Sequence, residues 1–340
     1  MSNFIVIGLC FLFGILIRTK GKFPSDSHKV INSFIISVSL PCMEFVPLRH
    51  ASLDGSFLTF AAMPWVLFGF GFLFFSFFGK LLDWKESTIV CLCLSAGLGN
   101  TSFLGIPLIE SYYSKEGLPT VLIIDQLGTF LTLAIPGTYL GTKARHALKN
   151  SETKSSLWKT LFTFPPFIAL LVSFASRPFS VPTELESAIS RIGDTLIPLA
   201  LFSVGYQLPG TIRINSEDRN AENPKRESDN SFRIRIPLLF GLVFKLIIGP
   251  ILVWLCFGTF FHYSEKNLGS DFFRNFKILI MESAMAPMIT GSLLAAEWGL
   301  SPRLAVSLVG IGIPLSFLTT LGLYYFLENQ AWTGTIFFGQ

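Results

Sequence analysis

Apolar residues gather in ten blocks along the chain, separated by short polar stretches. Each block is close to the roughly 20 residues that a helix needs to cross a lipid bilayer. The blocks occupy residues 3–17, 30–48, 57–79, 88–112, 118–141, 160–176, 188–207, 236–261, 276–298 and 304–327. The pattern predicts an all-α polytopic membrane protein with ten transmembrane helices.

Two longer polar stretches divide the predicted helices. The first, at 142–159, lies within "GTKARHALKNSETKSSLWK" and separates five blocks from five. The second, at about 209–235, includes "NSEDRNAENPKRESDN". We therefore expect a first five-helix repeat at 1–141, a cytoplasmic linker at 142–159 and a second five-helix repeat at 160–340. Because each repeat has an odd number of helices, the two would enter the membrane from opposite sides as inverted repeats.

Composition agrees with a membrane protein. Hydrophobic residues make up 51% of the chain and charged residues 14%, whereas soluble domains are about 25% charged. A net charge of +4 is too small to indicate a nucleic-acid surface, so the expected surroundings are a lipid bilayer and no nucleic acid.

The distribution of positive charge predicts the orientation. With the N-terminus outside, 18 of the 26 lysines and arginines fall on the inside and 7 on the outside. This asymmetry follows the positive-inside rule and places both termini on the non-cytoplasmic side of the plasma (inner) membrane. The first block is followed, not preceded, by Arg18, Lys20 and Lys22, so we interpret it as a helix and not as a signal peptide.

The fourth and ninth blocks contain helix-breaking residues at matched positions, in "GNTSFLGIP" and "ESAMAPMITG". A break within the membrane frees backbone polar groups, which must then face protein or a wet cavity. Half-helix ends can bind ions there, and Asn100, Thr101 and Ser102 add uncharged donors and acceptors. A proline kink packed against a neighbour is the alternative. Two matched breaks favour a substrate site near the bilayer midplane.

Several charged or amide side chains lie inside the apolar blocks, where such groups are functional candidates. Glu282 precedes Pro287 by five residues, Asp125 and Gln126 lie in the fifth block, and Asp194 lies in the seventh. For Glu282 and Asp125, two interpretations are open: coupling of a proton or cation, and structural hydrogen bonding to freed backbone.

Lys245 lies about nine residues into the eighth block. We interpret it as a lysine that reaches the cytoplasmic interface through its long side chain, with a salt bridge or anion contact as the alternative. The five cysteines fall in apolar blocks and are interpreted as packing residues. We expect neither a metal site nor a cofactor, apart from coupling to H⁺ or Na⁺.

The motifs in the fourth, fifth, ninth and tenth blocks resemble those of a known family. "GNTSFLGIPL" followed by "LIIDQLGTF", together with "MESAMAPMITGSLLAAEWGLSPRLAVSLVGIGIPLSF", resembles the bacterial permease branch of the auxin efflux carrier family. The resemblance implies ten helices in two inverted repeats, in a fold related to bile acid symporters and sodium/proton antiporters. Broken helices 4 and 9 would cross at the centre. Helices 1, 2, 6 and 7 would form a scaffold, often dimeric, and the others a mobile transport domain.

The resemblance also implies which residues form the crossing. The first break corresponds to Gly99, Asn100, Thr101 and Pro107, and the second corresponds to Met285, Ala286 and Pro287. Many members have Met and Pro adjacent at the second break, whereas Ala286 lies between them here. The short loop between the repeats departs from plant relatives, so transport of auxin itself is not implied.

Three classes of function are compatible with a polytopic membrane protein. The paired breaks favour a secondary active transporter for a small organic anion, with an ion-coupled symporter of the bile acid type as the alternative. An intramembrane enzyme would need catalytic motifs such as G-x-S-x-G or H-E-x-x-H, which the sequence lacks. A channel or membrane sensor would need a symmetric pore helix or a signalling domain. The substrate and the direction of transport are left open by the sequence.

Overall fold

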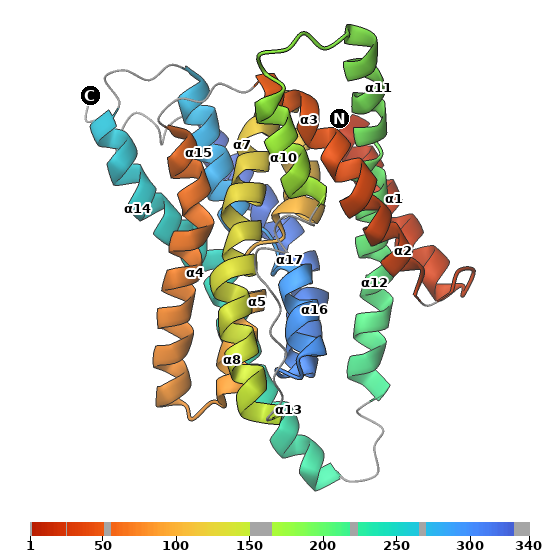
Figure 1. The fold of residues 1–340 in the computed structure, drawn as a ribbon. Coiled ribbons are helices and arrows are strands. Elements are labelled where there is room, and N and C mark those ends of the chain that lie inside the picture. The colour runs from red at the N-terminus through yellow and green to blue at the C-terminus, as the bar shows by residue number, and fades with distance from the viewer. Residues whose placement is uncertain are drawn as a thin grey trace.

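A computed structural model describes residues 2–24, 26–50, 56–149, 165–217, 224–264 and 270–329, and these residues form an all-helical fold (Figure 1). Six helical runs are long and apolar enough to cross a membrane: Ser27–His50, Leu58–Leu81, Lys115–Arg145, Thr183–Gln207, Ile234–Gly258 and Pro302–Glu328. Each of them overlaps one of the predicted blocks. The protein is therefore a polytopic integral membrane protein.

The first half contains long helices interrupted by short π-helical segments and by one 3₁₀ turn, η3. Its elements are α1 (Ser2–Thr19), α2 (Ser27–Phe34), η1 (Ile35–Ser39), α3 (Leu40–His50), α4 (Ser56–Leu81), α5 (Glu86–Ser95), η2 (Thr101–Gly105), α6 (Ile106–Tyr113), η3 (Lys115–Gly117), α7 (Leu118–Ile123), η4 (Ile124–Phe130), η5 (Leu133–Gly137) and α8 (Thr138–Lys149). Helix α8 extends beyond the predicted boundary at residue 141, and part of the predicted linker at 142–159 lies outside the described residues.

The second half also contains long helices, with the π-helical segment η7 between two of them. Its elements are α10 (Pro165–Ala175), α11 (Thr183–Gly193), α12 (Leu196–Glu217), α13 (Pro224–Val243), η7 (Phe244–Ile248), α14 (Gly249–Ser264), α15 (Ser270–Ser283), α16 (Ile289–Glu297) and α17 (Pro302–Glu328). Helices α12 and α13 extend into the predicted polar loop at about 209–235, part of which lies outside the described residues. The division of the chain into two repeats stays a prediction.

Helix α1 packs along α12, and the two lie side by side in Figure 1. Small residues allow this close approach, as is usual between membrane helices. A β-carbon on Gly14 would lie 2.2 Å from the Phe202 carbonyl oxygen, and one on Gly205 would lie 2.1 Å from the Phe11 carbonyl oxygen. The two glycines therefore fix the contact between the first helix and the seventh predicted span.

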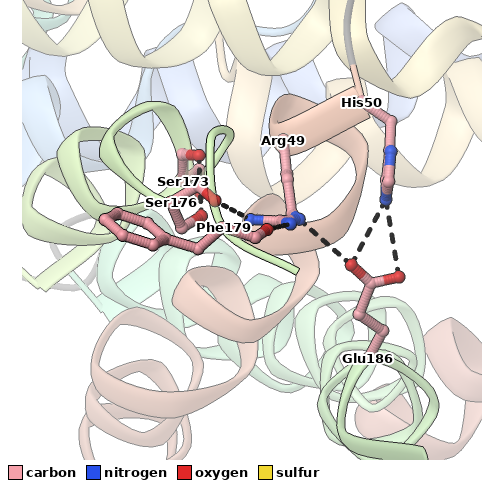
Figure 2. A network of polar contacts seen from close by, with 6 residues as sticks. All are labelled: Arg49, His50, Ser173, Ser176, Phe179 and Glu186. Atoms are coloured by element: carbon pink, nitrogen blue, oxygen red, sulfur yellow. Dashed lines mark hydrogen bonds and ion pairs between the residues drawn. The ribbon is translucent and has the colours of Figure 1, made fainter. Parts of the chain in front are cut away.

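A polar network fastens the end of α3 to α10, α11 and the turn between those two helices (Figure 2). The Arg49 guanidinium donates to the carbonyl oxygens of Ser176 and Phe179. Its Nε lies 3.2 Å from Glu186 Oε1, and His50 Nε2 lies 3.3 Å from the same oxygen. Each charged group of this network has an opposite charge or a backbone partner, so the network holds three helices together.

Apolar side chains cover much of the outer surface. Leu58 on α4, Tyr139 on α8 and Leu318 on α17 are more than 60% exposed. Such a surface suits contact with lipid tails, because they do not demand polar partners. Inside this shell, α5, α16 and α17 pack against one another.

Candidate functional site

The two predicted helix breaks meet in the interior of the protein. Helix α5 ends at Ser95 and the chain is helical again from Thr101, while α15 ends at Ser283 and α16 begins at Ile289. Between these helices, Gly99 and Pro287 form an isolated antiparallel bridge.

Two backbone hydrogen bonds join the breaks. The Asn100 amide donates to the Ala286 carbonyl oxygen at 2.9 Å, and the Met288 amide donates to the Ser95 carbonyl oxygen at 2.8 Å. Part of the freed backbone is thereby satisfied by the opposite break, as a buried interruption requires. Ala286, the residue that separates Met285 from Pro287, supplies one of the acceptors.

The other predicted residues of the breaks are buried beside this bridge. Met285 and Ala286 are fully enclosed. Pro287 packs on α17, where a β-carbon on Gly312 would lie 2.4 Å from the proline ring. Pro107 is buried at the start of α6, one turn beyond the break. The structure thus brings the predicted residues of both breaks into one region, whereas their role in binding stays a prediction.

Asp125 joins the fifth predicted span to the first break. Its Oδ1 accepts hydrogen bonds from the Thr101 hydroxyl and, at 2.6 Å, from the Ser102 hydroxyl. Its Oδ2 accepts a hydrogen bond from Gln126 Nε2 at 2.8 Å. Three side-chain donors therefore compensate the Asp125 carboxylate, whereas the predicted hydrogen bonding to freed backbone and the predicted coupling both stay predictions.

Glu282, in the last turn of α15, faces the first break across the crossing. A β-carbon on Gly105 would lie 2.5 Å from Glu282 Oε2 and 2.6 Å from Oε1, so only glycine leaves room for the carboxylate. The side chain is fully buried. Among the described residues, no hydrogen-bond donor reaches either carboxylate oxygen.

Lys245 lies in η7 and is fully buried, so the predicted interpretation that it reaches the cytoplasmic interface is wrong. Its Nζ donates to the Ser283 carbonyl oxygen at 2.9 Å, at the end of α15. The same nitrogen would lie 2.9 Å from a β-carbon on Gly99. It also interacts electrostatically with Glu282. Packing turns the side chain toward the breaks, which favours the alternative of a charge contact.

Three of the segments that present these side chains are π-helical. Thr101 and Ser102 lie in η2, Asp125 and Gln126 in η4, and Lys245 in η7. In η2, for example, the Gly105 amide donates to the Asn100 carbonyl oxygen at 3.0 Å. Single π turns are frequent at functional sites, because the wider turn redirects side chains and loosens the backbone hydrogen bonding.

Sequence reasoning missed Glu44, on α3. Its side chain is fully buried, and no hydrogen-bond donor among the described residues reaches either carboxylate oxygen. It interacts electrostatically with Asp125, which in turn interacts with Glu282. The available signal was a single acidic residue within the apolar block 30–48, close to Pro41.

Asp194, the acidic residue of the seventh block, does not lie in this site. Its side chain is half exposed and forms an ion pair with Lys115 at 3.1 Å.

Several buried polar atoms in this region have no hydrogen-bond partner among the described residues. Besides the oxygens of Glu44 and Glu282, they are Asn100 Nδ2, Gln126 Oε1, Thr129 Oγ1 and Ser292 Oγ. Buried polar atoms are normally paired, so water, an ion or a bound molecule can supply the partners of these groups. The set contains one amide donor, five acceptor oxygens and two hydroxyl groups, which suits a polar small molecule. Within the described residues no group of three His, Cys, Asp or Glu side chains suits a metal ion.

Comparison with known proteins identifies relatives over nearly the whole chain. A family model described as "Membrane transport protein" matches residues 3–324. An uncharacterized transporter of Methanocaldococcus jannaschii is 23% identical over 330 residues, covering 94% of this chain and 96% of the relative. An uncharacterized transporter of Methanothermobacter thermautotrophicus is 22% identical over 313 residues, covering 91% of this chain and 92% of the relative.

Proposed function

Because the chain belongs to the membrane transport protein family, we propose that it is a secondary active transporter that moves a small organic anion by alternating access. Membership confirms the resemblance to the auxin efflux carriers. The protein is thus a membrane transporter and not an enzyme, and the substrate class and mechanism are our proposal. The proposal rests on one observation: the paired breaks at Gly99 and Pro287, surrounded by buried polar atoms.

The proposed anion contacts come from both breaks. Asn100 Nδ2 is a buried donor beside the first break, and the Lys245 ammonium group lies at the second. The helices that restart at Thr101 and Ile289 direct their N-terminal partial positive charge to the crossing. A carboxylate is the simplest group that these donors can bind together. Thr101, Ser102, Pro107, Met285, Ala286 and Pro287 would shape the site.

Alternating access would follow from movement of one part of the protein against the other. In the proposed arrangement, ten spans form two inverted five-helix repeats, and the broken fourth and ninth spans cross in the part that moves. Spans 1, 2, 6 and 7 would form the fixed scaffold, and two copies would associate through it as a homodimer. The contact of α1 with α12 and the Arg49 network support this proposal, because they join elements of the scaffold to one another.

Energy would come from an ion gradient or from the gradient of the substrate itself. Asp125 and Glu282 are the candidate coupling groups for H⁺ or Na⁺, with Gln126 and Lys245 as their neighbours. An ion-coupled symporter of the bile acid type is therefore the second candidate function. The observation that favours it is the buried Glu282 carboxylate, which accepts no hydrogen bond from the described residues.

The substrate class is tested by thermal unfolding of the purified protein with a panel of organic acids and their methyl esters. A ligand that binds only the folded state raises the unfolding midpoint by mass action. We expect at least one acid to raise the midpoint while its ester does not, because the ester lacks the carboxylate. Equal shifts for acids and esters, or no shift with any acid, would refute the anion site.

Ion coupling is tested with the double variant Asp125→Asn, Glu282→Gln in proteoliposomes. The amides keep the shape of the side chains and cannot exchange a proton. If these groups couple transport to protons, substrate binding stays measurable and uptake no longer responds to an imposed pH gradient. An unchanged response would exclude proton coupling through these two residues, and a sodium jump on the same proteoliposomes then tests Na⁺.

The proposed orientation, with both termini on the non-cytoplasmic side of the plasma membrane, is tested by cysteine labelling in intact cells. Lys85→Cys, in the turn between α4 and α5, should be protected from a membrane-impermeant reagent. Ser180→Cys, in the turn between α10 and α11, should react with it. Both positions are exposed, so access to the reagent depends on the side of the membrane. The unmodified protein controls for its own cysteines, and the reversed pattern would contradict the orientation.

A further inference from the structure

Glu44 is the buried acidic side chain with the fewest compensating partners among the described residues near the broken helices. It is fully buried on α3, and none of the described residues donates a hydrogen bond to its carboxylate. Its electrostatic partner is another carboxylate, that of Asp125. A buried carboxylate is costly unless a donor or an opposite charge accompanies it. The protein residues in the described part of the chain supply neither to Glu44.

The other buried charged groups of the site already have compensation. Asp125 accepts three hydrogen bonds, and Lys245 donates to the end of α15 and interacts electrostatically with Glu282. Glu282 therefore has a cation within electrostatic reach. Glu44 differs from all of them, because no donor and no cation of the described structure is assigned to it. A positive group on a bound molecule would supply such a partner.

The charge balance leads to the same requirement. A chain of electrostatic interactions links Glu44 to Asp125, Asp125 to Glu282, and Glu282 to Lys245. It contains three carboxyl groups and one ammonium group. A cargo that carries only negative charge would add to the excess of acidic groups, whereas an ammonium group on the cargo would offset it.

Acceptors near Asp125 suit an ammonium group, which has three N–H donors. Gln126 Oε1 and Thr129 Oγ1 belong to η4, the segment that holds Asp125, and both are buried without a partner among the described residues. At the breaks, Asn100 Nδ2 and Lys245 Nζ are donors that could bind the carboxylate of the same cargo. Thr101, which follows Asn100, connects the two groups of residues through its hydrogen bond to Asp125.

We propose that the transported organic acid also bears an ammonium group, so that the cargo is a zwitterion of the amino acid type. The ammonium group binds at the Glu44 carboxylate, and the cargo carboxylate binds beside Asn100 and Lys245. This inference rests on the proposed function, since it assigns a second chemical group to the same cargo. It also gives Glu44 the role of selecting amino acids over simple acids.

The test uses purified full-length protein and pairs of compounds that differ in one amino group. The pairs are alanine and propionate, leucine and 4-methylpentanoate, phenylalanine and 3-phenylpropionate, aspartate and succinate, and glutamate and glutarate. The unfolding midpoint is measured against the concentration of each compound. We expect at least one amino acid to raise the midpoint, and its deaminated partner to need about tenfold more for an equal shift.

Glu44→Gln then tests the residue, because the amide keeps the size of the side chain and removes its charge. We expect the variant to respond equally to both members of that pair, within about twofold. Glu110→Gln is the matched control: Glu110 is buried on α6, and its electrostatic partners are Lys115 and Asp194. It should keep the wild-type preference. If Glu44→Gln fails to fold, Glu44→Asp, which retains the charge, should also keep the preference.

The possible outcomes separate the zwitterionic cargo and the role of Glu44 from the proposed transport of an organic anion. Equal shifts by amino acids and deaminated acids in the wild type would overturn the zwitterion and leave the organic-anion transporter standing. A preference that survives in Glu44→Gln would overturn the role of Glu44. No shift by any compound of either series would overturn the inference together with the proposed function.

Discussion

Helix α3 holds two charged side chains with opposite surroundings. Arg49, near its end, donates to two carbonyl oxygens and forms an ion pair with Glu186. Glu44, five residues earlier on the same helix, is fully buried and receives no hydrogen bond from the described residues. The first side chain joins α3 to α10 and α11, whereas the second lies within electrostatic reach of Asp125, which bonds to the first break.

The comparison shows how one helix can serve stability and binding separately. A compensated charge contributes to the folded state, because its partners remain in place without a ligand. An uncompensated buried charge lowers stability until another molecule supplies the partner. Departures of this kind from good local pairing are expected at functional sites. The contrast therefore predicts that variants of Arg49 act on stability and that variants around Glu44 act on transport.

The largest effect on stability is expected from Arg49→Ala. The variant leaves Glu186 without its buried partner and two carbonyl oxygens without donors, which should cost about 3 kcal/mol of unfolding free energy. Unfolding in mixed micelles with increasing denaturing detergent measures this loss. Lys29→Ala is the control, because its ion pair with Asp26 is exposed and should contribute under about 0.5 kcal/mol. Equal losses in the two variants would contradict the conclusion that the Arg49 network stabilises the fold.

Asn100→Ala should have the next largest effect, and on transport instead of stability. Losing the only buried side-chain amide donor assigned to the cargo should lower the transport rate about tenfold or more. Uptake into proteoliposomes measures the rate, and the unfolding midpoint should stay near that of the wild type. Ser173→Ala, which removes a buried hydroxyl that bonds within α10, should leave uptake unchanged. Wild-type uptake by a folded Asn100→Ala protein would make Asn100 a packing residue.

The sequence predicted the apolar helices and the paired breaks because single positions specify them. A bilayer requires long apolar runs, and a break within one requires residues such as the glycines and prolines of "GNTSFLGIP" and "SAMAP". Asp125 and Glu282 could be selected for the same reason, as acidic residues are rare in such runs. These features need no knowledge of which helix packs against which.

Lys245 and Glu44 could not be assigned from the pattern because their surroundings come from packing between distant helices. The depth of Lys245 in its block allowed its side chain to reach the interface, and only the approach of α15 and Gly99 turns it inward. Glu44 gains its relation to Asp125 when α3 packs on α7, about 80 residues later in the chain. The π-helical segments likewise produce no periodic signal of their own.

Gly105→Ala should have an intermediate effect, since it tests the close contact between the first break and Glu282. Its β-carbon would lie 2.5 Å from the carboxylate, so the side chain must move, at a cost of about 1 kcal/mol in stability. We expect uptake to fall by about fivefold as the site is distorted. Gly8→Ala on α1 is the control, because its β-carbon would meet open space. Similar uptake by the two variants would show that Glu282 can move freely.

Glu44→Gln should have the smallest effect on stability, and this result would separate Glu44 most clearly from Arg49. The wild-type carboxyl group has no donor to lose among the described residues, and the amide removes a buried acidic group within electrostatic reach of Asp125. We therefore expect an unfolding free energy within about 0.5 kcal/mol of the wild type, or slightly above it. The measurement is the one used for Arg49→Ala, on the same preparation. A loss as large as that of Arg49→Ala would mean that Glu44 has a structural partner. Glu44 would then belong with Arg49, as a residue that holds the helices together.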